Sequence, residues 1–460
     1  MSIFKACDIR GLAGKELDEA LARRLGLALG GLVRERSGQP VCLGGDFRRS
    51  TPALKLAVCE GLIEAGATVF DIGQNPTPLA YFAAARLKCP NIGIVTASHN
   101  PGRYNGLKFM VAGRPATPEL VEQLRARLGL AVPRVRPGHT QAMDMRAAYE
   151  AHVREQAAAT ARSGEACLSR RRLKIVVDPM GGAFAGIAPR IMAEAGCEVV
   201  AVSDELDPDF ARRDPNPSVD ENLKLLSERV VSERADLGLA LDGDGDRAAV
   251  VDHTGRVIRP EQMGALFLRH CFPKPTVVYD LKCASVLVAE ATAAGGVCVM
   301  QPSGHGFIKT AMLERQADLG VEVSGHFFFK ALGGGDDGLF AGLLTAHIVA
   351  ASGVSLAGLI QPIGWPAITP DLRVPFTGNG REVLERIEAS CGGTVTRLDG
   401  VRAQYATGWA LARMSITEPL ITLRFEGCDP ASLREIANRF LAGVPELSSI
   451  VSQKIRSLDI

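Results

Sequence analysis

The chain has 460 residues, 47% of them hydrophobic, which is enough to bury several cores and favours more than one domain. Lys and Arg number 52 against 51 Asp and Glu, so the protein has almost no net charge with which to attract nucleic acid or a membrane surface. Recognition of a small charged ligand by a local cluster is not excluded.

The first residues are too charged for an export signal. The opening MSIFKACDIRG places Lys5, Asp8 and Arg10 where an apolar core would be needed, and the longest apolar run, residues 339–354, is interrupted by His347. The 11 cysteines include no C-x-x-C pair, so neither a disulfide framework nor a zinc site is indicated. We therefore expect a cytoplasmic protein with no membrane partner.

One pattern occurs three times along the chain. Each copy reads as an apolar strand, an aspartate, a polar or glycine turn, an amphipathic helix and a second strand, with Asp46, Asp178 and Asp280 at the equivalent place. This order is typical of βαβ units and predicts an α/β protein with three similar domains, whose sheets are mixed and mainly parallel. The expected domains are residues 1–145, 146–252 and 253–362.

The stretch TASHNPGRYNGLKF, residues 96–109, places Ser98 beside His99 in a loop rich in turn formers. Three roles compete for Ser98: a helix N-cap, a hydrolase nucleophile and a phosphate carrier. No helix follows at once, which argues against the cap, and the flanks lack the G-x-S-x-G form of a hydrolase elbow. A phosphate carrier needs nearby cations and a metal, and Lys108 ends the same loop. We therefore favour the carrier.

Three aspartates alternate with glycines in the segment LDGDGDR. Asp242, Asp244 and Asp246 can all face one point if the backbone is extended or tightly looped. A plain acidic turn is disfavoured because three such close anions repel one another without a counter-ion. An EF-hand loop would need glycine and glutamate where this sequence has Arg247 and His253. We predict a site for a hard divalent cation such as Mg²⁺, shared with a substrate phosphate.

The segment VEVSGHFFFK places Glu322, Ser324 and His326 at alternating positions, with Gly325 between them. A carboxylate, a hydroxyl and an imidazole together suit vicinal sugar hydroxyls, because each hydroxyl both donates and accepts. A half-buried strand edge explains the same spacing, and the FFFK run is typical of a strand. Taken alone, this segment favours the strand edge.

Beyond residue 366 the pattern changes to short alternating strands. A turn signal at Asp399–Gly400 and a final helix over residues 430–440 accompany them. This change predicts a fourth domain, of α+β type, over residues 363–460.

A polar stretch within that fourth domain, RMSITEPLITLRFEG, resembles an anion cradle. Arg413, Ser415 and Thr417 project from one side of an extended loop, and Arg424 follows on a strand. A guanidinium and two hydroxyls suit a phosphate, but an ordinary polar hairpin explains this stretch equally well.

Seven ordered motifs span the chain: FKACDIRG, TASHNP with NGLK, DGDGDR, YDLKC, SGHGFIK, EVSGH with FFK and DDG, and RMSITEP. On these motifs the chain resembles the α-D-phosphohexomutase family, and most of all its bacterial phosphomannomutase/phosphoglucomutase branch. The resemblance implies four domains around a central cleft. It also implies reversible transfer of phosphate between the 1- and 6-positions of mannose or glucose, through a phosphoserine and a bisphosphorylated sugar.

The resemblance further implies roles for individual residues. Ser98 resembles the family's phosphoserine, and with Asp242, Asp244 and Asp246 it would hold one Mg²⁺ per chain. The remaining positions match residues near the transferring phosphoryl group or sugar (Arg10, Lys108, Arg247), in the third domain's part of the cleft (Lys282, His305), in the sugar-binding loop (Glu322, Ser324, His326) and in a clamp on the other phosphate (Arg413, Ser415, Thr417, Arg424).

The same resemblance suggests a general base, an activator and a small-molecule partner. Lys108 and His305 are candidates for the general base, Lys108 only if neighbouring cations lower its pKa. Glucose 1,6-bisphosphate or an equivalent would activate the enzyme, and a sugar phosphate is the expected small-molecule partner. We expect a monomer, with a dimer as the alternative.

Four positions depart from the family pattern: Cys7, Pro302, Val321 and Ile416. Val321 is expected to restrict the backbone of the sugar-binding loop, since β-branching disfavours unusual dihedral angles. Ile416 is expected to remove one phosphate contact. These departures leave two alternatives open, a phosphoglucosamine mutase and a sugar-phosphate binding protein with impaired catalysis.

Overall fold

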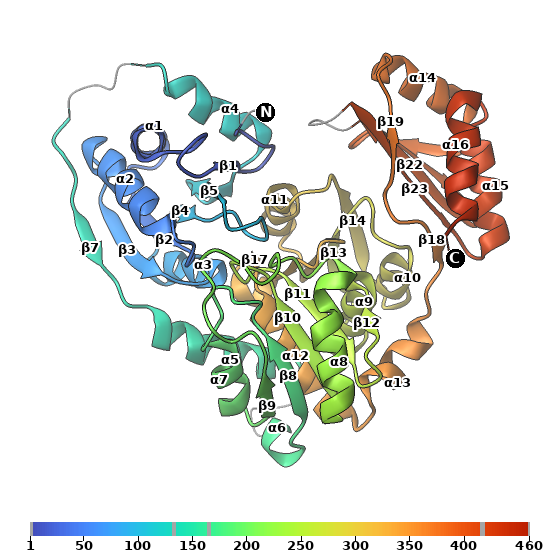
Figure 1. Ribbon diagram of the computed structural model, residues 1–460, viewed down its shortest axis with the longest axis horizontal. Helices are drawn as coiled ribbons and strands as arrows, with labels where there is room; N and C mark the ends of the chain where they lie inside the picture. Colours follow the sequence, from blue (N-terminus) through green and yellow to red (C-terminus); the bar gives the residue numbers. More distant parts are fainter. Residues whose placement is uncertain (1–2, 131–134, 163–166, 415–418, 459–460) are drawn as a thin grey trace.

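Four β-sheets follow one another along the chain, each with its own helices (Figure 1). The computed structural model describes residues 3–130, 135–162, 167–414 and 419–458. In Figure 1 the first sheet (blue) and the fourth (orange to red) lie on opposite sides of the upper part of the molecule, with the second and third between and below them. Three α/β/α domains and a C-terminal antiparallel sheet confirm the predicted α/β class.

The first sheet has the strand order β1-β5-β4-β2-β3-β7, with β6 paired to β5. Its parallel strands are β2 (Val41–Gly45), β3 (Val69–Gln74), β4 (Asn91–Val95) and β7 (Thr140–Ala142). Antiparallel pairing adds β1 (Ile9–Leu12), β5 (Tyr104–Val111) and β6 (Arg114–Pro115). The helices are α1 (Glu19–Arg36), α2 (Thr51–Glu64), α3 (Thr77–Arg86) and α4 (Pro118–Arg127).

The second sheet has the order β12-β11-β10-β8-β9. Its strands are β8 (Lys174–Asp178), β9 (Glu198–Ala201), β10 (Leu237–Leu241), β11 (Ala248–Asp252) and β12 (Val257–Ile258). Before and around it lie α5 (Arg146–Thr160), α6 (Cys167–Arg170), α7 (Ala188–Glu194), a 3₁₀ turn η1 (Asp220–Leu223) and α8 (Lys224–Glu233). The expected boundary at residue 252 therefore cuts this sheet, because β12 pairs antiparallel with β11 and extends the sheet to Ile258.

The third sheet repeats the second, with the order β14-β13-β15-β16-β17. Its strands are β13 (Thr276–Asp280), β14 (Val297–Gln301), β15 (Leu319–Val321), β16 (Phe327–Phe329) and β17 (Gly335–Asp336). Its helical segments are α9 (Pro260–Cys271), α10 (Val286–Ala293), α11 (His305–Arg315), η2 (Lys330–Leu332), α12 (Gly338–Ser352), α13 (Leu356–Ile360) and η3 (Gln361–Ile363). In both sheets a parallel core of three strands carries two antiparallel strands. The sheets are thus mixed, with parallel pairing confined to their cores.

The fourth sheet is antiparallel throughout, in the order β18-β23-β22-β21-β20 with β19 paired to β23. Its strands are β18 (Ala367–Ile368), β19 (Leu372–Pro375), β20 (Thr394–Thr396), β21 (Val401–Tyr405), β22 (Gly408–Met414) and β23 (Leu420–Gly427). The helices are α14 (Gly380–Ser390), α15 (Pro430–Phe440) and α16 (Pro445–Arg456). The predicted helix over residues 430–440 is α15, but it is not the final one, because Pro445 begins α16.

The predicted threefold repeat is visible in the turns that follow β2, β8 and β13. Asp46, Asp178 and Asp280 each accept a hydrogen bond from the backbone N–H two residues further on, at 3.0, 2.9 and 2.9 Å respectively. A short acidic side chain that closes such a turn ends the strand and directs the chain toward the next helix. The three turns are therefore equivalent features of the three sheets.

Helix α12 lies inside the molecule and joins two domains. Its N-cap Asp337 accepts from the Phe340 N–H at 3.0 Å and from the Tyr149 hydroxyl of α5 at 2.8 Å. Burial raises the pKa of Asp337 to about 7. Among the described residues no single helix has the length and apolarity to cross a membrane; α12 and residues 356–363 meet that test only when taken together as a pair bent by 91°.

We expect Asp337→Asn to stabilise the protein above neutral pH. The unfolded chain releases the Asp337 proton near pH 4, whereas the folded protein holds it to about pH 7, so the free energy of unfolding falls across that window and stays lower above it. Three pKa units correspond to at most about 4 kcal/mol. Thermal unfolding at pH 5 and pH 8 measures the difference. An equal loss of stability at both pH values would contradict this assignment.

Candidate functional site

Ser98 meets the three aspartates at a contact between the first and second sheets. It lies in the loop between β4 and β5, and Asp242, Asp244 and Asp246, here the acidic trio, lie in the loop between β10 and β11. The Ser98 hydroxyl donates to Asp242 Oδ2 at 2.8 Å, and all four residues are buried. Residues 144 positions apart are thus brought together, as the carrier hypothesis requires.

Asp242 uses both carboxylate oxygens for protein donors, whereas Asp244 and Asp246 each leave one without a hydrogen bond from the described residues. Asp242 Oδ1 accepts two backbone N–H groups of its own loop, at 2.9 and 3.1 Å. The Lys108 ammonium donates to Asp244 Oδ2 at 2.7 Å and to Asp246 Oδ2 at 2.5 Å. Asp244 Oδ1 and Asp246 Oδ1 are buried and have no hydrogen-bond partner among the described residues. One oxygen of each carboxylate lies within 4.8 Å of the others, so the trio could hold a hard divalent cation.

The charges around the acidic trio suit such an ion. Burial and then the neighbouring carboxylates Asp244 and Asp246 raise the pKa of Asp242, which reflects repulsion that a cation would remove. Burial lowers the pKa of Lys108, but the same two carboxylates outweigh it and the net shift is upward. Lys108 is therefore held as a cation, and the lowered pKa that a general base would need is not found.

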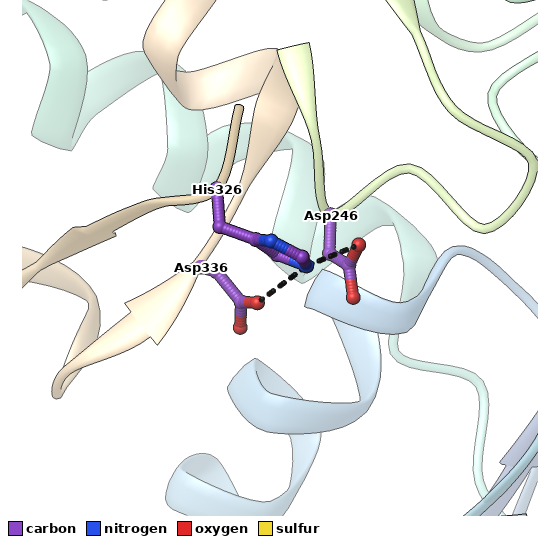
Figure 2. Close-up of side chains that lie close together, drawn as sticks. All are labelled: Asp246, His326 and Asp336. Atoms are coloured by element: carbon purple, nitrogen blue, oxygen red, sulfur yellow. Dashed lines mark ion pairs between the residues drawn. The ribbon is translucent and has the colours of Figure 1, made fainter. Parts of the chain in front are cut away.

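A second trio, Asp246, His326 and Asp336, also has the spacing of metal ligands (Figure 2). His326 Nε2 lies 3.2 Å from Asp246 Oδ1 and 3.7 Å from Asp336 Oδ2. Burial and Arg247 lower the pKa of His326, but Asp246 and Glu322 raise it by more, so that the net pKa is about 9. The imidazolium therefore already balances these carboxylates, and we assign this trio as an ion-pair network.

The predicted sugar-binding residues converge on His326. Its Nδ1 lies 2.9 Å from Ser324 Oγ and 3.2 Å from Glu322 Oε2. The strand-edge interpretation is wrong, because residues 322–325 form a turn between β15 and β16. Gly325 has φ +91° there, and a Cβ on it would lie 2.7 Å from the Ala248 carbonyl oxygen. Only glycine allows this turn to approach the second domain so closely.

Arg10 and His305 meet at Asp8, on the other side of the site. Arg10 donates to Asp8 Oδ2 through Nε at 2.8 Å and to Asn100 Oδ1 at 2.9 Å. His305 Nε2 lies 4.0 Å from Asp8 Oδ2 and has no hydrogen-bond partner in the part of the chain that the structure describes. Burial and the nearby Lys108 lower the pKa of His305 to about 3. His305 is therefore neutral near pH 7, and its buried imidazole is a weak base.

Lys282 and Arg424 approach each other across the junction between the third and fourth sheets. The Lys282 ammonium lies 3.3 Å from Asp371 Oδ2, and Arg424 lies 3.8 Å from Asp371 Oδ1. These three residues line a cavity of about 690 Å³ together with Ser324 and Trp365. The cavity therefore connects the His326 turn to cations from two domains.

The predicted phosphate cradle is only partly described. Arg413 pairs with Asp399 at 2.6 Å within the fourth domain. Ser415 and Thr417, as well as the departure at Ile416, lie outside the described residues. Of the two cradle residues that the structure describes, Arg424 lines the same cavity as Lys282 and Arg413 does not.

Two of the other departures lie beside the site. Cys7 is buried, and a Cβ on Gly306 would lie 2.9 Å from its Sγ. Val321 ends β15 in register with Tyr279 and Phe327. Its branched side chain thus occupies an ordinary strand position, and the expected restriction of the loop backbone is not seen.

Three contributors were missed at the sequence level. Thr77, the first residue of α3, donates its hydroxyl to Asp244 Oδ2 at 2.7 Å, and the Thr96 hydroxyl oxygen lies 3.2 Å from the same carboxylate oxygen. Asp371 supplies the counter-charge for Lys282. Thr96 stands in the conspicuous TASHNP stretch, two residues before Ser98, but no local pattern marks Thr77 or Asp371.

Four family models match the chain in order. They are the phosphoglucomutase/phosphomannomutase alpha/beta/alpha domain I over residues 1–129, domain II over 148–255, domain III over 259–363 and the C-terminal domain over 372–443. Together they cover most of the sequence.

Individual relatives match over nearly the whole length. The chain is 35% identical to the phosphomannomutase/phosphoglucomutase of Pseudomonas aeruginosa, over 95% of this chain and 94% of the relative. It is also 35% identical to the phosphoglucomutase of Neisseria gonorrhoeae, over 96% of each. A crystal structure of a phosphoglucomutase/phosphomannomutase family protein from Burkholderia thailandensis superposes with a TM-score of 0.87, at 33% identity and 97% coverage of both chains.

Proposed function

The chain belongs to the phosphoglucomutase/phosphomannomutase family of enzymes, and on that premise we propose that Ser98 carries the phosphoryl group that it exchanges between the 1- and 6-positions of a hexose phosphate. The observation that carries the proposal is the 2.8 Å hydrogen bond between the Ser98 hydroxyl and Asp242. It places a nucleophile beside three carboxylates, each with one oxygen close enough to the others to suit one Mg²⁺. When bound, Mg²⁺ offsets the charge on the oxygens of the transferring group.

In the first half-reaction a hydroxyl of the hexose monophosphate attacks the phosphorus on phosphorylated Ser98. The bond from phosphorus to Ser98 Oγ breaks and Oγ takes up a proton, while a bond from phosphorus to the sugar oxygen forms, which gives a hexose bisphosphate. The proton of the sugar hydroxyl passes to a base, for which we assign His305 on its position, because its buried Nε2 has no partner among the described residues. The negative charge of the bound phosphates would raise the pKa of His305 toward the range that a base needs. Lys108 and Arg10 serve as cations near the transferring oxygens.

In the second half-reaction the bisphosphate turns around and returns its other phosphate to Ser98. Both ends of the sugar must therefore be held in turn. We assign the turn of Glu322, Ser324 and His326 to the sugar hydroxyls, and Lys282 and Arg424 to the phosphate that does not react. Arg247 and the cradle residues Arg413, Ser415 and Thr417 complete the proposed site.

Intact-mass analysis tests the carrier directly. Wild-type protein incubated with glucose 1,6-bisphosphate and Mg²⁺ should gain one phosphoryl group, on Ser98. Turnover of glucose 1-phosphate, mannose 1-phosphate and glucosamine 1-phosphate, measured side by side, then ranks the substrates. The two relatives named above lead us to expect glucose or mannose phosphate to be preferred. Binding without any turnover would instead indicate a sugar-phosphate binding protein.

Asp371→Asn is expected to tighten substrate binding. The substrate phosphate must compete with Asp371 for Lys282 and Arg424, and a partly exposed ion pair is worth about 0.5–1 kcal/mol. KM should therefore fall by about twofold to fivefold, and calorimetry should show tighter binding of inorganic phosphate. Glu221→Gln is the matched control, since Glu221 lines the same cavity and forms no ion pair with the described residues. A higher KM in Asp371→Asn would show that Asp371 supports binding.

A further inference from the structure

Arg48 lies in the turn after β2, directly behind the Ser98 loop, and it is 1% exposed. Its guanidinium uses all five of its N–H groups. The Nε donates to Asp46 Oδ2 at 2.9 Å, and the two terminal nitrogens donate to four carbonyl oxygens of the Ser98 loop. These carbonyls belong to Ser98 at 2.5 Å, Asn100 at 2.7 Å, Pro101 at 2.9 Å and Tyr104 at 3.2 Å.

The loop that Arg48 binds has a backbone that serine seldom adopts. Ser98 has φ +51°, in the left-handed region that favours glycine. Its N–H donates to Thr96 Oγ1 at 2.9 Å, and its carbonyl accepts from Arg48. Thr96 Oγ1 and Arg48 Nε both donate to Asp46 Oδ2, at 2.7 and 2.9 Å. Both sides of Ser98 are thus tied to one buried carboxylate, which is how a strained conformation persists.

The equivalent turns of the other two repeats have no arginine at this position. Met180 and Lys282 stand two residues after the turn aspartates, where Arg48 stands in the first repeat. The carbonyl contacts are therefore a property of the domain that carries Ser98. The ring of Phe210, from the second domain, lies 4.8 Å from the Arg48 guanidinium, so the loop is fixed in register with the domain of the acidic trio.

We infer that Arg48 is a positioning residue for phosphoryl transfer, which holds the Ser98 oxygen in line with the acidic trio. This inference rests on the proposed function. Lysine at position 48 keeps the charge and can reach Asp46, but it cannot donate to four carbonyls in one plane. A displacement of about 1 Å at a reacting atom costs about 10²-fold in rate. A positioning role therefore predicts a loss in the transfer step, with substrate binding preserved.

The test compares Arg48→Lys with Arg49→Gln. Arg49 is the next residue, but its side chain is exposed and pairs with Asp209. We expect Arg48→Lys to lower kcat about 10²-fold, with KM within about threefold of wild type. The single-turnover rate of transfer from phosphorylated Ser98, counted per phosphorylated molecule, should fall equally. Arg49→Gln should stay within about twofold of wild type on all three measurements.

Counting per phosphorylated molecule separates positioning from folding, because misfolded protein is not counted. A wild-type transfer rate per phosphorylated molecule in Arg48→Lys would overturn the inference. If Arg48→Lys does not fold, Phe210→Leu, which removes the ring over the guanidinium, should lower the same rate; an unchanged rate there would also overturn it. If wild-type protein never gains phosphate on Ser98, the proposed function itself fails, so the two failures are distinguishable.

Discussion

Replacement of Ser98 by alanine is expected to abolish hexose phosphate turnover, with a loss of more than about 10³-fold. No other hydroxyl among the described residues is hydrogen-bonded to Asp242, so the variant has no substitute carrier beside the acidic trio. The fold should persist, because alanine tolerates the φ of +51° at position 98 about as well as serine. The assay supplies glucose 1-phosphate, Mg²⁺ and a trace of glucose 1,6-bisphosphate.

Ser50→Ala is the matched control for this prediction. Ser50 is a nearby serine whose hydroxyl accepts from Asn105 and does not contact the acidic trio. It should keep near-normal turnover and still gain one phosphoryl group in intact-mass analysis. Turnover in Ser98→Ala, or phosphate gained by that variant, would refute the carrier role.

Local sequence signals were sufficient for the fold class. The three turns at Asp46, Asp178 and Asp280 follow buried strands, and strand periodicity and turn chemistry are properties of neighbouring residues. The boundary after Asp252 was misplaced because a hairpin turn within a sheet has the same composition as a linker. Helix α16 was missed although Gly443 and Pro445 mark the end of one helix and the start of another.

From local patterns alone, the site was predictable only where its residues lie within one loop. The link between Ser98 and the acidic trio, 144 positions apart, came from the chemistry of a phosphate carrier and from the family resemblance. The acidic trio and the turn from Glu322 to His326 each lie within one loop. Arg48 and Asp371 act through contacts with residues distant in sequence, and their neighbours carry no pattern that indicates this. Such contacts are set by how the domains pack, which local propensity does not encode.

The acidic trio yields the second large prediction, in which activity and stability both fall. Asp244→Asn should lower turnover by about 10³-fold, or about 4 kcal/mol, because one carboxylate oxygen of the cation site is lost. In protein treated with EDTA, the same change should also lower the unfolding midpoint, because the buried Lys108 ammonium loses one of its two carboxylate partners.

Magnesium itself distinguishes this account from a purely structural role. Saturating wild-type protein at 100 times Kd should stabilise it by about 2.7 kcal/mol, whereas Asp244→Asn should show little response in thermal unfolding or calorimetry. Asp178→Asn is the control, because Asp178 is equally buried but pairs with Arg213, away from the trio. That control should lose stability and keep its response to Mg²⁺, since breaking a buried pair leaves one charge uncompensated. If Asp244→Asn also keeps its response to Mg²⁺, the acidic trio is not the cation site.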